Sequence, residues 1–526
     1  MRMTRLRTLP ETIAWRAAHT PDRVFLQTTA GDTVSYRQQH EAGLAVAGGL
    51  RELGVEPGER VVSLQALGPV AFANWLGIGY LRAWDVPVHT DGPGDALVYA
   101  IRNVEAATVV TDGSYVPQLA AVADQLPLLR RVVVTDDVEI PDLPFEVVRQ
   151  SELAGAKPWD DGDPPQPRDV ATVVHSSGTT GPPKAIIVPW GSFSAQAVRM
   201  WPLADLTEDD VFYTYAPTYY TASKCFPEMM AMLGGRCLLQ PRMSVPDFWA
   251  DVRAHGVTTS IVYREAAEYL LDRPTADDDA DTPLRNVMMI PVSPRHQEFR
   301  DRFAVRICTG YGSSEVGNIT TSGGWDTENW ASVGKVTPGP PGWQYRIVDQ
   351  HDYEVAPGEV GELLVRPDEP WTMSLGYHGM PERTAAAWRN GWFHMGDAVR
   401  EDADGSIHWI DRFSDLLRPG GVATASYEIE RWFLRHPDVA ECAAIASGGT
   451  TDDSEVTVYV VANPGTSPSV AELARFAADT MPADIVPQHV ALIDALPRTE
   501  ASNRIQKAVL RALDRSTAAD AGGSAG

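Results

Sequence analysis

Apolar and polar residues follow two different periods along the first part of the chain. Residues 40–53 place apolar side chains at helical spacing and end at Gly54, a residue that suits the position just after a helix. The following segment, 60–64, has the short apolar run of a strand. Together they predict a helix followed by a strand.

The same order of elements is repeated further along the chain. Asp95 is placed to cap a helix that runs through Val104, and residues 108–111 form a short apolar run typical of a buried strand. Alternating helices and strands favour parallel or mixed sheets covered by helices. We therefore predict an α/β fold.

A second, smaller α/β pattern begins near the C-terminus. Residues 408–411 (HWID) predict the last strand of the large pattern. Beyond it the expected elements are a helix at 428–434, strands at 439–445 and 456–461, and a helix at 470–480. The tail from Ser516 has no apolar side chains to bury. We expect an N-terminal domain at 1–411, a C-terminal domain at 412–515 and a disordered tail at 516–526.

Composition narrows the class of protein. With 526 residues, of which 44% are hydrophobic and 22% charged, the chain is a large globular protein with several cores. Its net charge of −26 repels nucleic acids and anionic membranes. The four cysteines are too few and too scattered for a disulfide framework, and no apolar run is long enough for a signal peptide or a membrane span. We expect a cytoplasmic protein without a nucleic acid or membrane partner.

The most informative stretch is residues 173–188, VVHSSGTTGPPKAIIV, in which one apolar strand enters a polar loop and another leaves it. The loop offers hydroxyl groups, backbone N–H groups that glycine exposes to close approach, and one ammonium group, which together suit a polyphosphate. These groups belong to Ser176, Ser177, Thr179 and Thr180, to Gly178 and Gly181, and to Lys184. A Walker phosphate loop, in which Gly-Lys-Ser/Thr opens a helix, is excluded because Pro182 and Pro183 precede the lysine and β-branched residues follow.

A flexible Ser/Gly-rich hairpin would explain a fragment such as SGTTG but not the full string. The loop resembles the signature SSGTTGPPK of the adenylate-forming superfamily, which includes acyl-CoA synthetases, peptide-synthetase adenylation domains and luciferases. Ala185 stands where that family usually has glycine, and His175 is expected to be a packed residue at the end of a strand. The resemblance implies that the loop, through Lys184, binds ATP.

A second motif of this family matches residues 309–317, TGYGSSEVG. By resemblance, Tyr311 would stack on adenine, Ser314 would contact the α-phosphate, and Glu315 would hold Mg²⁺. One or two carboxylates are the usual protein ligands of a Mg²⁺ that also binds phosphates. By itself this Gly-rich motif would be a weak signal.

Two further motifs complete the resemblance, which extends over residues 10–512 and is closest to acyl-CoA ligases. In GWFHMGD, Asp397 matches the residue that binds the ribose hydroxyls. In DRFSDLLRPGG, Arg412 matches a ribose-contacting arginine, Ser414 the hinge between the domains, and Gly421 a glycine that lines the tunnel of the second half-reaction. The family fold implies that the small C-terminal domain is mobile.

The sequence departs from the family at the catalytic lysine loop. The family has Pro-x-Thr-x-x-Gly-Lys, whereas this chain reads PRTEASNRIQK, which places Arg504 at the lysine and Asn503 at the glycine. Arginine keeps the charge but has a larger, planar head group. We assign catalysis to Arg504, together with Lys184 and Glu315; Lys507 is the alternative to Arg504, and a third possibility is that neither acts.

A second departure lies at residues 217–225, PTYYTASKC, where relatives commonly have Pro-x-x-His before the acid pocket. Tyr220 takes the place of the histidine and could gate the pocket, and Lys224 could meet an anionic substrate. Ordinary packing or surface exposure is the favoured explanation of both residues. At the second half-reaction, Val422 and Ala423 replace polar residues that are common in CoA ligases.

The resemblance implies an AMP-forming ligase that adenylates a small acid with ATP and Mg²⁺ and transfers it to an acceptor. CoA is the expected acceptor, which would make the protein an acid–CoA ligase. The alternatives are an amine acceptor, as in an amide-forming ligase or a nitrite-activating diazotisation enzyme, and a carrier protein loaded by a stand-alone adenylation enzyme. A non-catalytic nucleotide-binding homologue is a further alternative, against which the intact Lys184, Glu315, Asp397 and Arg412 count.

Overall fold

The computed structural model describes residues 7–160, 163–176, 183–242, 244–325, 329–336, 341–449, 453–498, 505–513 and 519–520. These residues form two compact units. The first contains the described residues of 1–176, 184–344 and 366–386, and the second contains Tyr345–Val365 and the described residues from Ala387 onward. The domain boundary expected between residues 411 and 412 stays a prediction.

A seven-stranded sheet in the first unit has the strand order β7-β6-β5-β3-β4-β8-β9. Its strands are β3 (Arg60–Leu64), β4 (Trp84–Pro87), β5 (Thr108–Thr111), β6 (Arg131–Val134), β7 (Glu146–Arg149), β8 (Val170–His175) and β9 (Ala185–Pro189). All neighbours are parallel except β8 and β9, which run antiparallel and form a hairpin. Strands β3 and β5 confirm the predictions made for residues 60–64 and 108–111.

A second seven-stranded sheet of this unit has the order β14-β13-β12-β10-β11-β1-β2, in which only β2 is antiparallel to its neighbour. Its strands are β1 (Val24–Thr28), β2 (Thr33–Ser35), β10 (Val211–Thr214), β11 (Arg236–Leu239), β12 (Thr259–Tyr263), β13 (Asn286–Ile290) and β14 (Arg306–Cys308). Beyond β14 the chain forms a three-stranded sheet of β15 (Gly310–Ser313), β16 (Gly317–Thr321) and β17 (Lys335–Val336).

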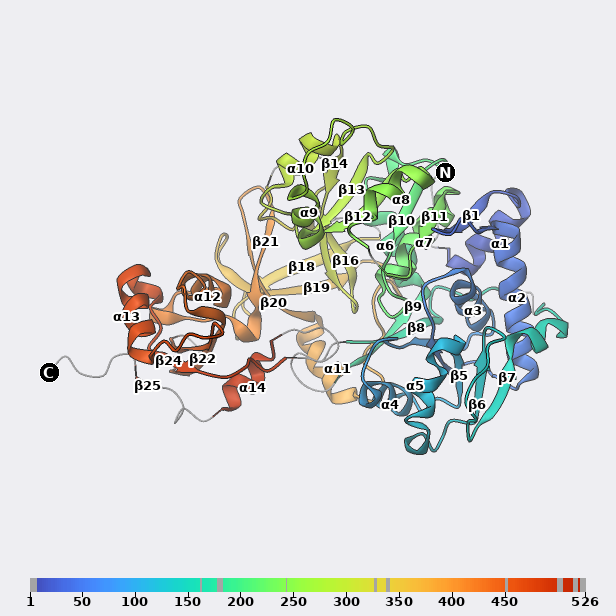
Figure 1. Ribbon diagram of the computed structural model, residues 1–526, viewed down its shortest axis with the longest axis horizontal. Helices are drawn as coiled ribbons and strands as arrows, with labels where there is room; N and C mark the ends of the chain where they lie inside the picture. The colour runs from blue at the N-terminus through green and yellow to red at the C-terminus, as the bar shows by residue number, and fades with distance from the viewer. Residues whose placement is uncertain are drawn as a thin grey trace. The chain divides into compact units, whose positions relative to one another are not determined.

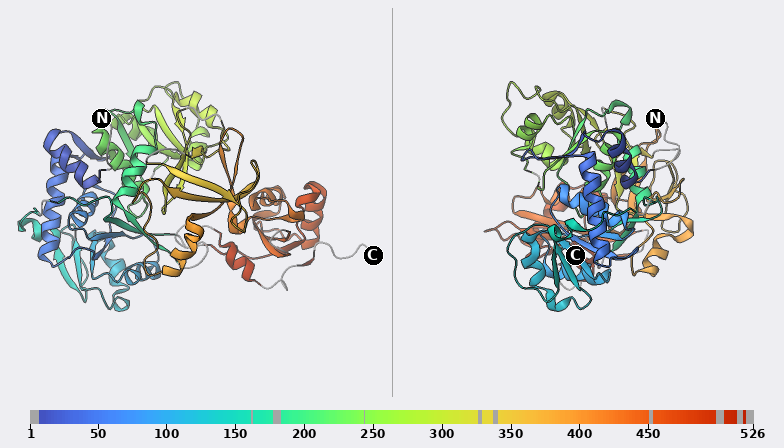
Figure 2. Two further views of the ribbon diagram at one scale, coloured as in Figure 1. Left: turned by 180° about the vertical axis from the view of Figure 1, so that it is seen from behind. Right: turned by 90° about the vertical axis from the view of Figure 1, so that its right-hand side faces the viewer.

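Helices cover these sheets, and Figures 1 and 2 show α2 and α3 packed side by side. They are α1 (Leu9–His19), α2 (Tyr36–Glu52), α3 (Pro69–Tyr80), α4 (Gly94–Asn103), α5 (Val116–Ala120), α6 (Trp190–Arg199), α7 (Ala222–Leu233), α8 (Phe248–His255), α9 (Arg264–Leu271), α10 (His296–Phe303) and α11 (Pro381–Ala387). Each large sheet has its own apolar core. The expected α/β fold is therefore confirmed.

The ends of two predicted helices allow the predicted cap residues to be compared with the observed ones. Helix α2 begins with a capping box formed by Ser35 and Gln38 and is followed by Gly54 at a φ of +82°, as expected from the glycine. The predicted cap of α4 is wrong: Pro93 is the N-cap residue, and Asp95 lies inside the first turn. Its carboxylate there interacts favourably with the positive end of the helix dipole, which explains why the sequence signal was similar.

The second unit contains two four-stranded sheets. One consists of β18 (Trp343–Val348), β19 (Val360–Pro367), β20 (Phe393–Glu401) and β21 (Ile407–Arg412), and the other of β22 (Val439–Gly449), β23 (Ser454–Ala462), β24 (His489–Leu492) and β25 (Ala519–Asp520). Helices α12 (Ser426–Phe433) and α13 (Val470–Thr480) pack on the second sheet, and α14 (Lys507–Ala512) contacts β22. The predicted C-terminal α/β pattern is confirmed.

Two residues of the expected disordered tail, Ala519 and Asp520, form β25, which pairs antiparallel with His489 and Val490 of β24, and disorder of the tail stays a prediction. Backbone hydrogen bonds to a sheet edge need no apolar side chain, so composition could not reveal this strand. In the parts of the chain that the structure describes, none of the helices combines the length and the apolar character needed to cross a bilayer.

Candidate active site

The β8–β9 hairpin carries the two described ends of the phosphate-loop motif. The backbone N–H of Ser176 donates to the carbonyl of Lys184 over 2.9 Å, and the backbone N–H of Lys184 donates to the Ser176 hydroxyl over 3.0 Å. These bonds fix the base of the loop. The predicted ATP contacts Ser177, Gly178, Thr179, Thr180 and Gly181 lie outside the described residues and stay predictions.

At the base of this loop, a tyrosine links the lysine to a carboxylate. Nζ of Lys184 lies 3.5 Å from the hydroxyl of Tyr377 and 4.8 Å from the centre of its ring, and the hydroxyl donates to Oε1 of Glu315 over 3.1 Å. Burial raises the pKa of Tyr377, and the neighbouring Glu315 raises it further, so the phenol remains a hydrogen-bond donor at neutral pH. The fold thus links Lys184 to Glu315 through Tyr377.

Tyr377 is held in place by the backbone of β9. The carbonyl of Ala185 accepts from the N–H of His378 over 2.8 Å, and Ile187 exchanges hydrogen bonds with Leu375 and Gly376. The sequence analysis missed Tyr377. No local pattern could have revealed it, because Lys184 and Tyr377 are 193 positions apart and only the fold brings them together.

The predicted adenine and metal residues occupy the β15–β16 hairpin. Tyr311, Ser314 and Glu315 are each half-buried. Tyr311 pairs with Thr320, and Gly312 pairs so closely with β16 that an added Cβ would lie 1.7 Å from the carbonyl oxygen of Gly317. The hairpin therefore requires glycine at 312 to hold Glu315 in position.

His175 ends strand β8 directly before the phosphate loop. Its ring lies edge-on to Tyr99 with the centroids 6.2 Å apart, and both ring nitrogens are buried without a hydrogen-bond partner in the described part of the chain. Burial, together with the smaller effect of His378, lowers the pKa of His175 to about 4. The imidazole is therefore neutral at physiological pH.

In the second unit, the predicted ribose residues meet on the β20–β21 pair. Asp397 is 4% exposed and accepts from Nη1 of Arg412 and Nε1 of Trp409, both over 3.1 Å. Asp397 and Arg412 are direct cross-strand partners, so the antiparallel register places them together. Trp409 was missed as a site residue, although its segment was predicted to be a strand.

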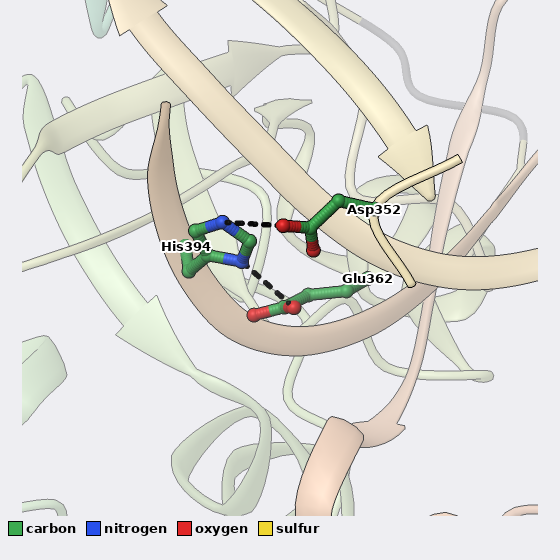
Figure 3. Close-up of side chains that lie close together, drawn as sticks. All are labelled: Asp352, Glu362 and His394. Atoms are coloured by element: carbon green, nitrogen blue, oxygen red, sulfur yellow. Dashed lines mark hydrogen bonds and ion pairs between the residues drawn. The ribbon is translucent and has the colours of Figure 1, made fainter. Parts of the chain in front are cut away.

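A charged cluster supports the turn that carries Asp397 (Figure 3). His394 Nδ1 lies 2.9 Å from Glu362, and its Nε2 lies 4.0 Å from Asp352. Arg389 donates to Asp352 over 3.0 Å and to Glu362 over 3.2 Å, and the N–H of Gly396 donates to Glu362 over 3.1 Å. Arg389 and the N–H of Gly396 thus pair with these carboxylates, and the cluster fixes the backbone directly before Asp397.

Two basic residues of α14 form hydrogen bonds and ion pairs with other residues of the second unit. Arg511 donates to the carbonyl of Ser414 over 2.7 Å and also pairs with Asp415, so it holds the predicted hinge residue, which is exposed. Lys507 pairs with Glu430 over 2.6 Å and also donates to the hydroxyl of Ser426. The predicted catalytic Arg504 lies outside the described residues.

The two predicted acid-pocket residues have different environments. Tyr220 is 49% exposed and lies beside Tyr219, with ring centroids 4.7 Å apart. Lys224 is 5% exposed, and its Nζ lies 2.9 Å from Oδ2 of Asp85 and 4.2 Å from the centre of the Trp75 ring. Burial lowers the pKa of Lys224, against the raising effect of Asp85. The sequence analysis missed Asp85.

Comparison with known families agrees with these motifs. Residues 13–378 match the family model described as AMP-binding enzyme, and residues 428–503 match the model of the AMP-binding enzyme C-terminal domain. The chain belongs to the AMP-binding enzyme family. The predicted AMP-forming ligase of the adenylate-forming superfamily is thereby confirmed.

Individual relatives cover nearly the whole chain. A crotonobetaine/carnitine–CoA ligase of Salmonella paratyphi A is 27% identical over 488 residues, which are 90% of this chain and 92% of the relative. The anthranilate CoA ligase AuaEII in complex with anthranoyl-AMP has 22% identity and a TM-score of 0.77, covering 96% of this chain and 97% of that one. The o-succinylbenzoate CoA synthetase of Bacillus subtilis in complex with ATP and magnesium has 21% identity and a TM-score of 0.76, covering 94% and 98%.

Proposed function

We propose that the chain is an acid–CoA ligase. In the first step a carboxylate oxygen of the acid attacks the α-phosphorus of ATP, and pyrophosphate leaves. In the second step the thiolate of CoA attacks the carbonyl carbon of the acyl-adenylate, and AMP leaves. The observation that carries the proposal is the link from Lys184 through Tyr377 to Glu315, which places a cation and a carboxylate at the base of the phosphate loop.

Lys184 and Glu315 have different roles in binding a polyphosphate together with its metal ion. Lys184 would neutralise phosphate oxygens, and Glu315 would hold the Mg²⁺, a hard cation that prefers carboxylate oxygen. Ser176 and the loop residues add hydroxyl and N–H donors. The magnesium complex of the Bacillus subtilis synthetase supports the choice of metal.

The remaining nucleotide contacts are those that the resemblance to the adenylate-forming superfamily implies. Tyr311 stacks on adenine, Ser314 contacts the α-phosphate, and Asp397 accepts from the ribose hydroxyls beside Arg412. The buried position of Asp397 supports this role, because two donors already fix the orientation of its carboxylate. Residues 412–515 form the mobile domain and turn at Ser414.

We assign the catalytic cation of the first step to Arg504. The pairing of Lys507 with Glu430 and Ser426 supports this choice, because it engages the ammonium of the alternative residue. A donor aimed at developing charge contributes about 3–4 kcal/mol to the first transition state. Arg504→Ala should therefore slow pyrophosphate release about 100-fold or more and slow thiolysis of a supplied acyl-adenylate much less.

The same two assays on Lys507→Met provide the control for Arg504. This variant should retain pyrophosphate release within a few-fold of the wild type, provided its thermal unfolding midpoint is close to that of the wild type. An equal loss of both half-reactions in Arg504→Ala would remove Arg504 from the first step.

The proposed function is tested by nucleotide product analysis. Purified protein is incubated with ATP, Mg²⁺ and a panel of small acids that includes nitrite, each with and without CoA or an amine. We expect acid-dependent AMP and pyrophosphate, with AMP release accelerated by CoA. If only an amine accelerates AMP release, the enzyme makes an amide or a diazo compound. If a phosphopantetheinyl carrier protein accelerates it, the enzyme loads a carrier protein. If no acid yields AMP, the protein is a non-catalytic homologue.

The relatives support the choice of CoA. The Salmonella relative and both structural neighbours are CoA ligases or CoA synthetases by name, and the AuaEII structure contains an acyl-adenylate. The small acid itself is not identified by these names.

A further inference from the structure

A cavity of about 270 Å³ lies in the first unit, between one face of the β5–β6 pair and the helices α2 and α3. Small side chains on the two helices, such as Ala45 and Ala73, leave this space, and Val133 of β6 forms part of the opposite wall. Because an apolar cavity of about 150 Å³ holds benzene, this one has room for a ligand of about two fused rings.

Three polar side chains also line the cavity: Asn74 of α3, Thr135 and Gln150. Thr135 and Gln150 directly follow the carboxyl ends of β6 and β7, and Gln65 and Asp112 follow those of β3 and β5 in the same way. The strand order reverses at β3, which has β4 on one side and β5 on the other. Ligands of open α/β sheets commonly bind outside the carboxyl ends of the strands near such a reversal. The cavity thus lies where this kind of sheet commonly binds a ligand.

A chain of side-chain hydrogen bonds determines which polar group remains for a ligand. Asp112 accepts from Nε2 of Gln65 over 3.3 Å and from the hydroxyl of Thr135 over 2.7 Å. Oε1 of Gln65 accepts from Asn74 over 3.2 Å, and Oδ1 of Asn74 accepts from Nε2 of Gln150 over 2.9 Å. A carboxylate offers only acceptors, so Asp112 sets the orientation of each amide along the chain. The group at the far end is therefore a carbonyl oxygen, Oε1 of Gln150.

Oε1 of Gln150 is buried and has no hydrogen-bond partner in the described part of the chain. A buried carbonyl oxygen without a partner is destabilising, and a ligand with an O–H or N–H group would satisfy it. The described side chains that line the cavity are all uncharged, so none of them would compensate a charged ligand. The cavity therefore favours an uncharged, mainly apolar ligand with one hydrogen-bond donor.

We propose that this cavity is a binding site for a small, uncharged and mainly apolar molecule that carries one O–H or N–H donor, and that Oε1 of Gln150 accepts the hydrogen bond from it. The residues that line the cavity belong to none of the nucleotide-binding motifs. The inference therefore does not depend on the proposed ligase function.

Three compounds of similar size test the class of ligand: indole, which has an N–H donor, benzofuran, which has an oxygen in its place, and phenylacetate, which is charged. Calorimetric titration should give indole a Kd about 5-fold lower than that of benzofuran, because indole forms one additional hydrogen bond. Gln150→Met removes the acceptor and should abolish this difference. An undiminished preference for indole in Gln150→Met would overturn the assignment of Gln150.

Ala73→Leu fills part of the cavity and tests the site by size. It should raise the Kd for indole about 10-fold or more and keep the thermal unfolding midpoint at or above that of the wild type, because the added carbons occupy empty space. The matched control is Ala100→Leu: Ala100 of α4 is 5% exposed, against 6% for Ala73, but lies in a packed core and does not line the cavity. The control should lower the midpoint and leave the Kd unchanged. An unchanged Kd in Ala73→Leu, or a midpoint lowered as in the control, would overturn the cavity as the binding site.

Crystals of the full chain soaked with a bromoindole locate the ligand directly. The anomalous signal of bromine should lie between α2, α3 and the β5–β6 pair, and bromophenylacetate should not occupy this position. Bromine from the indole at other positions only, or at none, would overturn the site. Equal occupancy of the cavity by bromophenylacetate would overturn the proposed class of ligand.

Discussion

The phenol of Tyr377 contacts both Lys184 and Glu315, and its removal tests whether their positions depend on this link. Tyr377→Phe keeps the buried ring but removes the hydrogen bond to Glu315. A hydrogen bond to a charged group contributes about 1.5–3 kcal/mol. We expect kcat/KM for ATP, measured by pyrophosphate release, to fall roughly 10- to 100-fold.

A matched control for Tyr377→Phe is Tyr213→Phe. Tyr213 also donates to a carboxylate, that of Asp251, over 2.5 Å, but it belongs to the core of the second large sheet. This variant should lower thermal stability without a comparable loss of activity. Equal activity in Tyr377→Phe and the wild type would show that Lys184 and Glu315 are positioned by other contacts.

His175 provides a prediction about acid stability. Its folded pKa of about 4 lies below the ordinary value of 6.5, so the unfolded chain binds the extra proton first as the pH falls. As the pH falls from 7 to 4, the free energy of unfolding should decrease by about 3 kcal/mol relative to a protein with a non-titrating residue at this position. This group should cause no further decrease below that pH.

Urea unfolding of the wild type and His175→Phe at pH 7 and at pH 4.5 checks this prediction. The stability of the variant relative to the wild type should improve at the lower pH, because phenylalanine cannot be protonated. If the difference between the two proteins is the same at both pH values, His175 titrates normally in the folded state.

At the scale of single elements, the β15–β16 hairpin depends on the absence of a side chain at Gly312. Gly312→Ala would force a Cβ against the carbonyl oxygen of Gly317, a backbone atom that cannot move without opening the hairpin. Overpacking of this kind costs about 1–3 kcal/mol. We expect a lower thermal unfolding midpoint and a higher KM for ATP, since Glu315 follows directly.

Gly324→Ala is the control in the loop after β16, where an added Cβ meets no atom within 4 Å. It should change neither the midpoint nor the KM. A Gly312→Ala variant that resembles this control would show that the hairpin can relax without displacing Glu315.

Elements with a strong local signal could be predicted from the sequence almost to the residue. Strand β5 and helix α13 match their predicted ranges, because one is a short apolar run and the other has helical spacing behind the capping box of Ser469 and Glu472. The cap of α4 was misplaced because an acidic residue favours the first turn as well as the cap position.

The site was predictable only where a motif carries its own chemistry. Lys184, Glu315, Asp397 and Arg412 lie in such motifs, and the structure pairs Lys184 with Glu315 through Tyr377 and Asp397 with Arg412 directly. Partners such as Tyr377 and Asp85 could not be predicted, because sheet order, rather than spacing along the chain, determines which distant strands become neighbours.

At the scale of the whole molecule, the two units have separate apolar cores. Phe433 is fully buried in the core of α12, α13 and the last sheet, and Phe303 is 1% exposed in the core of the second large sheet. Truncation of a buried phenylalanine costs about 3–5 kcal/mol. Phe433→Ala should therefore accelerate hydrogen exchange in peptides of the second unit, and Phe303→Ala in peptides of the first.

Mass spectrometry of exchanged peptides, together with calorimetry, measures this effect for both variants. The two phenylalanines serve as controls for each other, because they are of equal size and similarly buried. Accelerated exchange throughout the chain in either variant would show that the described units unfold together as one cooperative body.

The buried pair of Asp85 and Lys224 restricts how positions 85 and 224 can change during evolution. The two residues stand 139 positions apart, so no single mutation can remove both. Loss of one partner leaves an uncompensated buried charge and costs about 3–5 kcal/mol, a large part of the stability of a protein. Among descendants of a common ancestor, the two positions should therefore carry charges together or be neutral together.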